Sequence, residues 1–377
     1  MISVVKGDLF ESRAQTLVNT VNCVGVMGKG IALGFRKRFP EMYEDYVKRC
    51  AQHDVRLGEP YLYRTLVTPW ILNFPTKDHW RSVAKLSDIT AGLEYLTAHY
   101  KDWGITSLAV PPLGCGEGKL EWQVVGPTLY RFLAALDADV ELYAPFNTPE
   151  SELDTTFLGK HANAESMNDV PVRLPASSVA LAAILRMIER EPYHWPVGRI
   201  MFQKIAYFAQ EAGIPTGLDY RRSSYGPFAE GLKRVTSTLV NNGVVEERRS
   251  GRMFIVETGS TYPDAVRRYK QQLESWRPAI EKVVDLLIRA DTSRSEVLAS
   301  AHFAAQALSA RSKLRSAPLP TENDVVHEVS EWKIHRKPPL DSTEIASAVR
   351  ALSMLGWIDV QLSTDLPVEH DLLEVTA

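Results

Sequence analysis

The sequence has few cysteines, no long apolar run and almost no net charge. Three cysteines occur in 377 residues, Cys23, Cys50 and Cys115, and their positions follow no metal-ligand spacing. Because an odd number of scattered cysteines is atypical of a disulfide framework, we expect free thiols, a cytoplasmic protein and no metal site.

No apolar stretch approaches the roughly 20 residues that a membrane-spanning helix needs. The apolar run at 2–5 breaks at Gly7 and lacks the core of a signal peptide, so we expect a protein that is neither exported nor membrane-bound. The net charge of −3 favours no class of charged partner. A composition of 45% hydrophobic and 24% charged residues is typical of a packed protein, and 377 residues predict two domains.

Two glycine-rich stretches stand out, at residues 22–32 and 111–120. Each follows a short apolar run typical of a buried strand and leads into a helical pattern. Glycines at such a junction leave backbone N–H groups bare at a strand end and a helix start, where phosphates bind. We therefore expect the first loop to hold a ribose and a phosphate, and the second loop to hold a diphosphate.

Residues 73–80, between the two loops, read Asn-Phe-Pro-Thr-Lys-Asp-His-Trp. Their polarity and the proline predict a turn that closes a short strand at 70–72. We expect the chemistry of the protein to lie in this turn.

The first half alternates strands with helices. The expected strands are at 2–5, 16–22, 107–110 and 140–144, with a hairpin pair at 61–63 and 70–73, and the expected helices are at 31–39, 41–53, 88–100 and 122–136. This order predicts an α/β fold whose mixed, mostly parallel sheet has helices on both faces. Ligands of such sheets bind at the carboxyl ends of the strands, where both loops lie.

Residues 148–176 are polar and rich in turn formers, which predicts a linker with at most a short helix. The linker would join a domain at 1–147 to a helix-rich domain at 177–377. Helices of the second domain are expected at 179–191, 199–212, 228–242, 263–290, 294–310, 322–333 and 342–355, with a small β-hairpin at 242–256.

The second half also has an uneven charge distribution. Basic pairs occur at 221–222, 233–234, 248–249 and 267–268, whereas residues 359–377 carry five acidic residues and no lysine or arginine. These charges are typical of a solvated surface, and they also suit a surface that docks a partner, with the acidic end imitating a phosphate backbone.

Three motifs of the first half occur in the order found in ADP-ribose-binding macrodomains, namely Gly7-Asp8-Leu9-Phe10, Asn22 with residues 27–32, and residues 111–120. About the first 147 residues thus resemble that family. The forms of 74–80 and 114–122 are similar to those of the macrodomain antitoxins that counter DarT-type toxins, which ADP-ribosylate thymidine in single-stranded DNA. They are also similar to those of terminal ADP-ribose glycohydrolases.

Residues 201–210, followed by Tyr225-Gly226-Pro227-Phe228, resemble the Panacea, or SocA-like, antitoxin domain. That family is associated with neutralising toxins by direct contact. The resemblance implies that the second half binds a toxin.

The macrodomain resemblance implies a role for each motif residue. Asp8 and Leu9 would face the adenine, Asn22 would hold the distal ribose, and Lys77 would act at the anomeric carbon. The residues implied in binding ADP-ribose are Asp8, Leu9, Asn19, Asn22, Gly28, Gly30, Ile31, Gly114, Cys115, Gly116, Glu117 and Gly118. Thr76, His79 and Trp80 would lie on the nucleobase side.

The residues alone leave simpler roles open. Asp8 could cap a helix, Asn22 could stabilise its own turn, Lys77 could be a solvated loop lysine that contacts phosphate, and Trp80 could be buried under the turn. Cys115 has no histidine and acid suggested nearby, which favours a small buried residue over a nucleophile.

One position departs from the family pattern. In terminal ADP-ribose glycohydrolases an aspartate of the second loop assists the lysine, whereas this sequence has Gly118 at that place, next to Glu117. Either Glu117 substitutes for the aspartate or the reaction needs no such acid. Lys77 itself could attack the sugar or stabilise the charge that develops there.

The resemblance implies an antitoxin that removes ADP-ribose from thymidine in single-stranded DNA and also binds and neutralises its DarT-type toxin. The expected partners are that toxin, ADP-ribosylated single-stranded DNA and ADP-ribose, and no cofactor is expected. Two other functions stay open: a reader that binds ADP-ribose without turnover, and a hydrolase of ADP-ribosylated glutamate in proteins.

Overall fold

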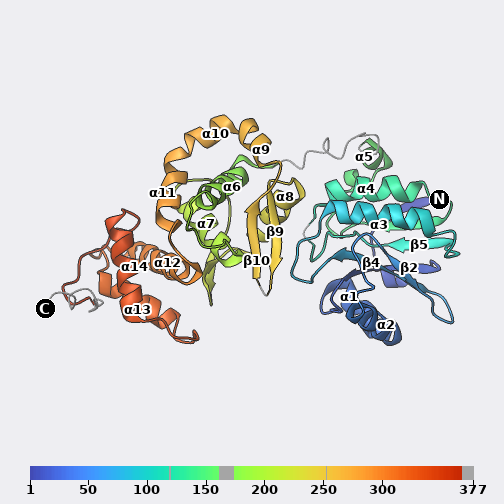
Figure 1. Cartoon of the computed structure of the whole chain (residues 1–377), viewed down its shortest axis with the longest axis horizontal. Helices are drawn as coiled ribbons and strands as arrows, with labels where there is room; N and C mark the ends of the chain where they lie inside the picture. The colour runs from blue at the N-terminus through green and yellow to red at the C-terminus, as the bar shows by residue number, and fades with distance from the viewer. Residues whose placement is uncertain (119, 161–173, 252, 367–377) are drawn as a thin grey trace. The chain divides into compact units, whose positions relative to one another are not determined.

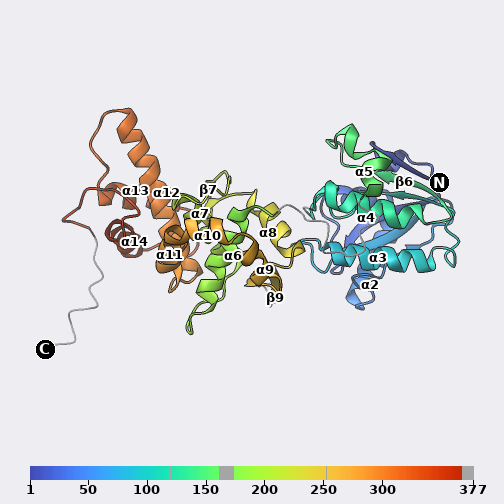
Figure 2. The same ribbon diagram turned by 90° about the horizontal axis from the view of Figure 1, so that it is seen from above.

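The computed structural model describes residues 1–118, 120–160, 174–251 and 253–366, and the chain divides into two compact units (Figure 1, Figure 2). Residues up to 174, with 236–242, form the first unit, and residues 175–235 with those from 243 onward form the second. Lys119 of the second glycine-rich loop, residues 161–173 of the predicted linker and the acidic end from 367 lie outside the described residues.

The first unit is built on a six-stranded sheet with the order β1-β6-β5-β2-β4-β3. Its strands are β1 Ile2–Val5, β2 Thr16–Asn22, β3 Tyr61–Tyr63, β4 Trp70–Lys77, β5 Ser107–Val110 and β6 Asp139–Tyr143. All neighbouring strands are parallel except β3, which pairs antiparallel with β4. The mixed, mostly parallel sheet predicted from the sequence is thus confirmed.

Helices cover both faces of this sheet (Figure 1). The helices of the unit are η1 Leu9–Glu11, α1 Gly30–Arg38, α2 Pro40–Ala51, α3 Leu86–His99, α4 Trp122–Ala134, η2 Glu150–Glu152 and α5 Thr155–Lys160. One core lies between the sheet and α3, α4 and α5, and includes Leu93, Leu129 and Leu158. The other lies between the sheet and α1 and α2, and includes Phe35 and Met42.

The predicted linker carries the short helix that its sequence allowed. Leu158 of α5 is fully buried and belongs to the core on the α3 and α4 side. Since a buried leucine contributes roughly 1.5–3 kcal/mol, α5 helps to stabilise the first unit.

The second unit consists mainly of helices, with two small hairpins. Its helices are α6 Ala176–Glu189, α7 Arg199–Glu211, α9 Tyr262–Arg268, α10 Lys270–Ser275, α11 Arg277–Leu287, α12 Thr292–Leu314, α13 Glu322–Trp332 and α14 Ser342–Met354. Helix α8 Leu232–Asn241 is divided between the units, since residues 236–242 belong to the first. The hairpins are β7 Arg221–Ser223 with β8 Gly226–Phe228, and β9 Val245–Ser250 with β10 Met253–Thr258. The helix-rich domain and the hairpin near Ser250 are as predicted.

Two predicted helices of this unit were wrong in part. The helix expected at 263–290 is three helices, α9, α10 and α11. The break before α11 has a clear cause, because Pro278 lacks the N–H that a helix interior requires and lies in the first turn of α11 instead. The helix expected at 228–242 begins only at Leu232, because Gly226, at φ +86°, and its neighbours form the β7–β8 hairpin.

Candidate functional site

The three sequence motifs meet at one edge of the first sheet. Strand β2 lies between β4 and β5, and the three strands are parallel, so their carboxyl ends point the same way. Loop 1, residues 22–30, follows β2; Lys77 ends β4; and loop 2, residues 111–121, follows β5. Strand β2 pairs with β4 as far as Asn22 but with β5 only at Thr16 and Leu17. A ligand site at this edge is the position expected for an open α/β sheet.

Lys77 is a strand residue, and the turn predicted over 73–80 is wrong in its first part. Strand β4 continues through Pro75 to Lys77. Strand β3 pairs with β4 only at residues 71–73. Beyond residue 73, β4 needs no N–H donor on the side that faced β3, so a proline is tolerated at position 75. The turn itself begins at Asp78.

Lys77 contacts both loops, loop 2 through its side chain and loop 1 through its backbone. It is only 8% exposed, so it is not the solvated loop lysine that the sequence left open. Its Nζ donates a hydrogen bond to the carbonyl oxygen of Glu117 in loop 2. Its own carbonyl accepts the N–H of Cys23 in loop 1 at 3.1 Å. A largely buried lysine at the end of β4 is therefore hydrogen-bonded to both glycine-rich loops.

Asn22 uses its side chain within loop 1. Its Nδ2 donates to the carbonyl of Val26 at 2.6 Å, and its Oδ1 accepts the N–H of Val24 at 3.0 Å. The Tyr46 hydroxyl donates to the Asn22 carbonyl at 2.7 Å. These contacts are those of a residue that stabilises its own turn, and contact with the distal ribose stays a prediction.

Tyr46 is a site-supporting residue that sequence reasoning missed. Its signal was the burial period of α2, where Met42, Tyr46 and Cys50 lie four residues apart on one face.

Loop 1 ends at a helix start whose donors have no capping side chain. Lys29 is the N-cap of α1 and makes no side-chain cap bond. Gly28 and Gly30 are exposed and Ile31 is half-buried. Gly30 has a φ of +56°, which favours glycine. The first N–H groups of α1 suit a phosphate oxygen.

Loop 2 is closed on itself at its base and open at its tip. The carbonyl of Gly114 accepts the Leu120 N–H at 3.1 Å. A Cβ at Gly118 would lie 2.3 Å from that same carbonyl oxygen and 2.8 Å from the Ala84 Cβ, so residue 118 must be glycine. A Cβ at Gly116 would meet nothing within 4 Å. The tip around Gly116 and Glu117 is exposed.

The same geometry bears on the missing aspartate. No side chain fits at position 118, because the Gly114 backbone occupies the space. The neighbouring Glu117 is exposed, and it contacts Lys77 through its carbonyl oxygen. Replacement of the aspartate by the Glu117 carboxylate stays a prediction.

Cys115 has the environment of a structural thiol. Burial raises its pKa to about 12, so the thiol is protonated at neutral pH and is a poor nucleophile. Burial likewise raises the pKa of Cys23 to about 12. All three cysteines are free. Within the ranges that the structure describes, no group of three or more His, Cys, Asp and Glu side chains could hold a metal ion.

Asp8 and Leu9 lie at the carboxyl end of β1. Asp8 is exposed, and its Oδ1 caps η1 by accepting the Phe10 N–H at 3.0 Å. Leu9 is buried at 4% exposure. The capping role left open by the sequence is therefore present, and an additional contact with adenine stays a prediction.

Asn19 lies in the core, away from the loop surfaces. It is fully buried, and its Nδ2 donates to Oδ1 of Asn73 at 2.8 Å, on the face that α1 and α2 cover. Met27 of loop 1 packs there too, with its Sδ 3.9 Å from the same nitrogen. From this buried position Asn19 supports loop 1 through Met27. Direct contact of Asn19 with ADP-ribose remains a prediction, and its burial does not favour it.

The residues predicted for the nucleobase side lie on both sides of Lys77 along the chain. Thr76 is buried at 5% exposure. The rings of His79 and Trp80 stack with centroids 5.4 Å apart. Trp80 is 46% exposed, so the alternative of an aromatic residue buried under the turn is wrong.

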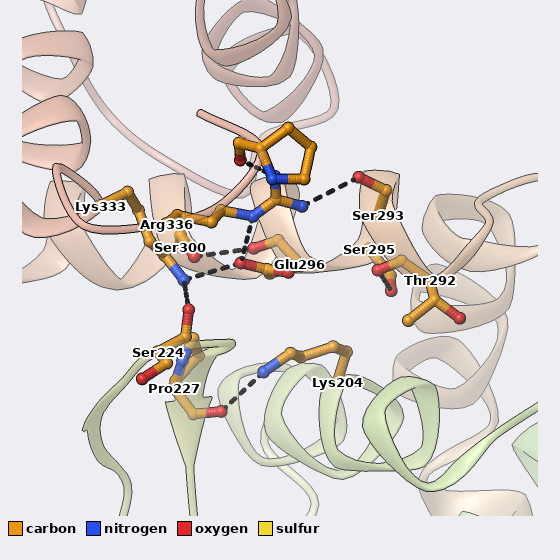
Figure 3. Close-up of polar contacts among 11 residues, drawn as sticks. Lys204, Ser224, Pro227, Thr292, Ser293, Ser295, Glu296, Ser300, Lys333 and Arg336 are labelled. Atoms are coloured by element: carbon orange, nitrogen blue, oxygen red, sulfur yellow. Dashed lines mark hydrogen bonds and ion pairs between the residues drawn. The ribbon is translucent and has the colours of Figure 1, made fainter. Parts of the chain in front are cut away.

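A second polar cluster lies in the second unit (Figure 3). Lys204 Nζ donates to the carbonyl of Pro227 at 2.9 Å, and Lys333 Nζ donates to that of Ser224 at 2.7 Å. Glu296, also buried, accepts from Lys333 Nζ at 2.8 Å. Burial, and then the nearby charge of Lys333, lower the pKa of Lys204 to about 7. The cluster fixes the turn of the β7–β8 hairpin, which contains the Tyr-Gly-Pro-Phe motif.

Comparison with known proteins identifies the first unit. Residues 18–129 match the family model described as Macro domain, so the unit is a macrodomain. The chain is 46% identical to a solved structure, the macrodomain of Mycobacterium tuberculosis DarG, covering 98% of that chain and 38% of this one with a TM-score of 0.38. The first unit is thus a macrodomain whose sequence is similar to that of the Mycobacterium tuberculosis DarG macrodomain.

Two curated relatives are also similar to this chain, one over a longer stretch and one that is a fusion protein. The DNA ADP-ribosyl glycohydrolase of Thermus aquaticus is 37% identical over 245 residues, which cover 63% of this chain and 64% of the relative. A DNA ADP-ribosyl transferase-DNA ADP-ribosyl glycohydrolase fusion protein of Thermosipho africanus is 40% identical over 177 residues, which cover 42% of this chain and 46% of that protein. The chain thus spans less than two thirds of the length of these relatives.

The first of these alignments is longer than the first unit. Its 245 residues exceed the 174 residues that precede the second unit together with the segment 236–242. Part of the second unit is therefore also similar to the Thermus aquaticus protein. No helix among the described residues has the length and apolarity needed to cross a membrane.

Proposed function

We propose that this chain is an antitoxin whose macrodomain removes ADP-ribose from thymidine in single-stranded DNA. The observation that carries the proposal is the largely buried Lys77, whose amine contacts loop 2 and whose carbonyl contacts loop 1, the two glycine-rich loops at the carboxyl ends of adjacent strands. The name of the Thermus aquaticus relative, a DNA ADP-ribosyl glycohydrolase, supports the same reaction. The cytoplasm is the proposed compartment.

In the proposed reaction the bond between the anomeric carbon of the distal ribose and the thymine nitrogen breaks. The oxygen of water forms the new bond to that carbon, and the thymine leaves as a resonance-stabilised anion that takes up a proton. Lys77 acts at the anomeric carbon, where its amine attacks or its charge stabilises the reacting group. Loop 1 and loop 2 hold the ADP-ribose so that this carbon faces the amine.

The proposed reaction is tested with the full-length chain and an oligonucleotide that carries one ADP-ribosylated thymidine. We expect the wild-type chain to release free ADP-ribose, and Lys77→Ala to lose at least about 100-fold in rate, the scale of one lost electrostatic or nucleophilic group. The exposed Lys101→Ala, at the opposite edge of the sheet, should keep wild-type activity. Wild-type activity in Lys77→Ala would remove this residue from the mechanism.

Two further arms separate the alternatives. Binding of ADP-ribose without any release would indicate a reader. Faster release from ADP-ribosylated glutamate in a protein than from DNA would indicate a protein hydrolase. Glu117→Gln decides whether that carboxylate replaces the missing aspartate: since Lys77 contacts the carbonyl, we expect its rate to stay within a few-fold of wild type.

We propose further that the second unit binds and neutralises a DarT-type toxin. The alignment that reaches into this unit supports the proposal, as does the fusion protein whose name joins a DNA ADP-ribosyl transferase to a glycohydrolase. In this division residues 1–147 with α5 form the hydrolase, the rest of 148–176 is the linker, and 177–377 form a Panacea-like toxin-binding domain.

Full-length Lys77→Ala tests the toxin-binding proposal without truncating the chain. We expect this variant to form a complex with the toxin and to protect cells that express it, although it cannot reverse the modification. Loss of protection in this variant would place all neutralisation in the hydrolase, and failure of the wild-type chain to form the complex would contradict toxin binding.

A further inference from the structure

The turn that follows Lys77 presents an aromatic residue and an arginine to solvent. Trp80 is 46% exposed, and Arg81 is exposed as well. The Arg81 guanidinium carbon lies 4.5 Å from the centroid of the Trp80 ring. The His79 ring is stacked on the same indole, with an interplanar angle of 28°. His79 and Arg81 thus both lie against the Trp80 ring, part of which stays exposed, and we call these three side chains the Trp80 stack.

The backbone of the turn holds this stack in place. The His79 N–H donates to Oδ1 of Asp78 at 2.7 Å, and the Arg81 N–H donates to Nδ1 of His79 at 3.1 Å. An exposed indole fixed in this manner keeps its position without a ligand. Because the Trp80 side chain is already ordered before binding, a flat ligand that stacks on it loses less free energy to the ordering of that side chain.

The Trp80 stack adjoins the reactive amine along the chain. Asp78 follows Lys77 directly, and its carbonyl, like that of Lys77, lies within hydrogen-bond distance of the Cys23 N–H in loop 1. The stack therefore begins at the end of β4 that carries the amine, beside loop 1 and outside the two loops assigned to ADP-ribose.

We infer that Trp80 and Arg81 bind the DNA chain next to the modified thymidine, with a neighbouring base on the indole and a backbone phosphate on the guanidinium. The inference rests on the proposed function and names the part of the substrate that these residues contact. The diphosphate of ADP-ribose is assigned to the two glycine-rich loops, whereas a DNA chain supplies one further phosphate for every nucleotide. An acidic peptide would use the arginine but not the exposed indole, and a single strand uses both.

The size of the effect follows from the two contacts. Stacking of one base on an aromatic side chain is worth about 1–3 kcal/mol, so loss of the indole should weaken the use of an oligonucleotide about tenfold or more. Loss of one phosphate contact should lower the salt dependence of binding by about one ion. Both losses should affect a substrate that has no neighbouring nucleotides less than they affect the oligonucleotide.

The test compares two substrates of the full-length chain, the ADP-ribosylated thymidine nucleoside and the same nucleoside within a single-stranded oligonucleotide. Arg81→Gln should lower kcat/KM for the oligonucleotide about tenfold and leave that for the nucleoside unchanged, and Trp80→Ala should lower kcat/KM for the oligonucleotide about tenfold more than that for the nucleoside. Arg64→Gln is the matched control, because the Arg64 guanidinium lies over the Trp70 ring at 5.2 Å, at the opposite end of the same strand. It should change neither value.

Equal losses on both substrates would overturn the inference, since the stack would then act by positioning Lys77, and so would unchanged kinetics on the oligonucleotide. Binding of the same modified oligonucleotide, followed by fluorescence anisotropy, gives a readout that needs no turnover. If the wild-type chain released ADP-ribose from neither substrate, the proposed function would fail. The inference would still be tested by the binding of the modified oligonucleotide. Weaker binding with lower salt dependence in Trp80→Ala and Arg81→Gln would support it, and unchanged binding would contradict it.

Discussion

Gly118→Ala is the substitution whose effect the structure defines most sharply. The added Cβ would lie 2.3 Å from the Gly114 oxygen, 2.9 Å from the Gly114 carbonyl carbon and 2.8 Å from the Ala84 Cβ. Two of these atoms are backbone and the third is a fully buried methyl group, so no flexible side chain can move aside. Overpacking of this kind typically costs about 1–3 kcal/mol.

That free energy must appear in one of two measurements. If loop 2 keeps its conformation, the variant loses about 1–3 kcal/mol of unfolding free energy. If the loop relaxes away from Gly114, its N–H groups leave the positions that face the diphosphate, and ADP-ribose must restore them on binding. The same 1–3 kcal/mol then weakens ADP-ribose binding by about 5- to 150-fold.

The assay is a pair of experiments on the full-length chain, urea unfolding and calorimetric titration with ADP-ribose. Gly159→Ala in α5 is the matched control, since its Cβ would meet nothing within 4 Å, and its binding should stay at wild type. Gly116→Ala should fold normally for the same reason, yet weaken binding if the tip of loop 2 contacts the diphosphate. Wild-type stability together with wild-type affinity in Gly118→Ala would refute the assigned role of loop 2.

Three other outcomes are expected from the described contacts. Lys333→Met should lower the free energy of unfolding by about 3 kcal/mol, because it leaves the buried Glu296 carboxylate with one cation fewer. The control Lys337→Met, at an exposed lysine, should leave stability unchanged when the two variants are compared by thermal unfolding. Burial lowers the pKa of His302 to about 4, so on acidification the unfolded chain protonates this histidine before the folded chain does. The free energy of unfolding should therefore fall by about 2 kcal/mol between pH 7.5 and pH 5. In urea titrations His302→Gln should remove this loss. Cys115→Ala should retain the wild-type rate of ADP-ribose release, because its thiol is protonated at neutral pH; a large loss would make the thiol part of the mechanism.

The sequence predicted the sheet of the first unit well because its strands are continuous apolar runs. Leu17, Val18 and Val21 of β2 and Leu108 and Val110 of β5 are buried on both faces of the sheet, as parallel strands require. The glycine-rich loops follow these strands directly, so their convergence at one edge could be expected from the strand order alone.

The position of Lys77 could not be predicted in the same way. A proline and several polar residues in 73–80 are typical of a turn, and only the pairing with β3 shows that β4 tolerates Pro75. Contacts between distant segments also escaped prediction, such as the Tyr46 hydroxyl on Asn22 and the Lys77 amine on the Glu117 carbonyl. Such contacts depend on how helices and loops meet in space, which local periodicity does not encode.

The second unit shows the same limit. Its helix starts at Thr292, Glu322 and Ser342 carry side-chain caps from Asp291, Thr321 and Asp341, and their positions were close to those predicted. The β7–β8 hairpin was missed, because its turn is held from within by Lys204 and Lys333 and not by a strong local turn signal.

Calorimetric titration of the full-length chain with ADP-ribose tests most directly whether the two loops and Lys77 form one binding site. We predict saturable heat with one ADP-ribose bound per chain, and much weaker binding by Gly118→Ala than by Gly159→Ala. No saturable heat from the wild-type chain would contradict the assignment of this site.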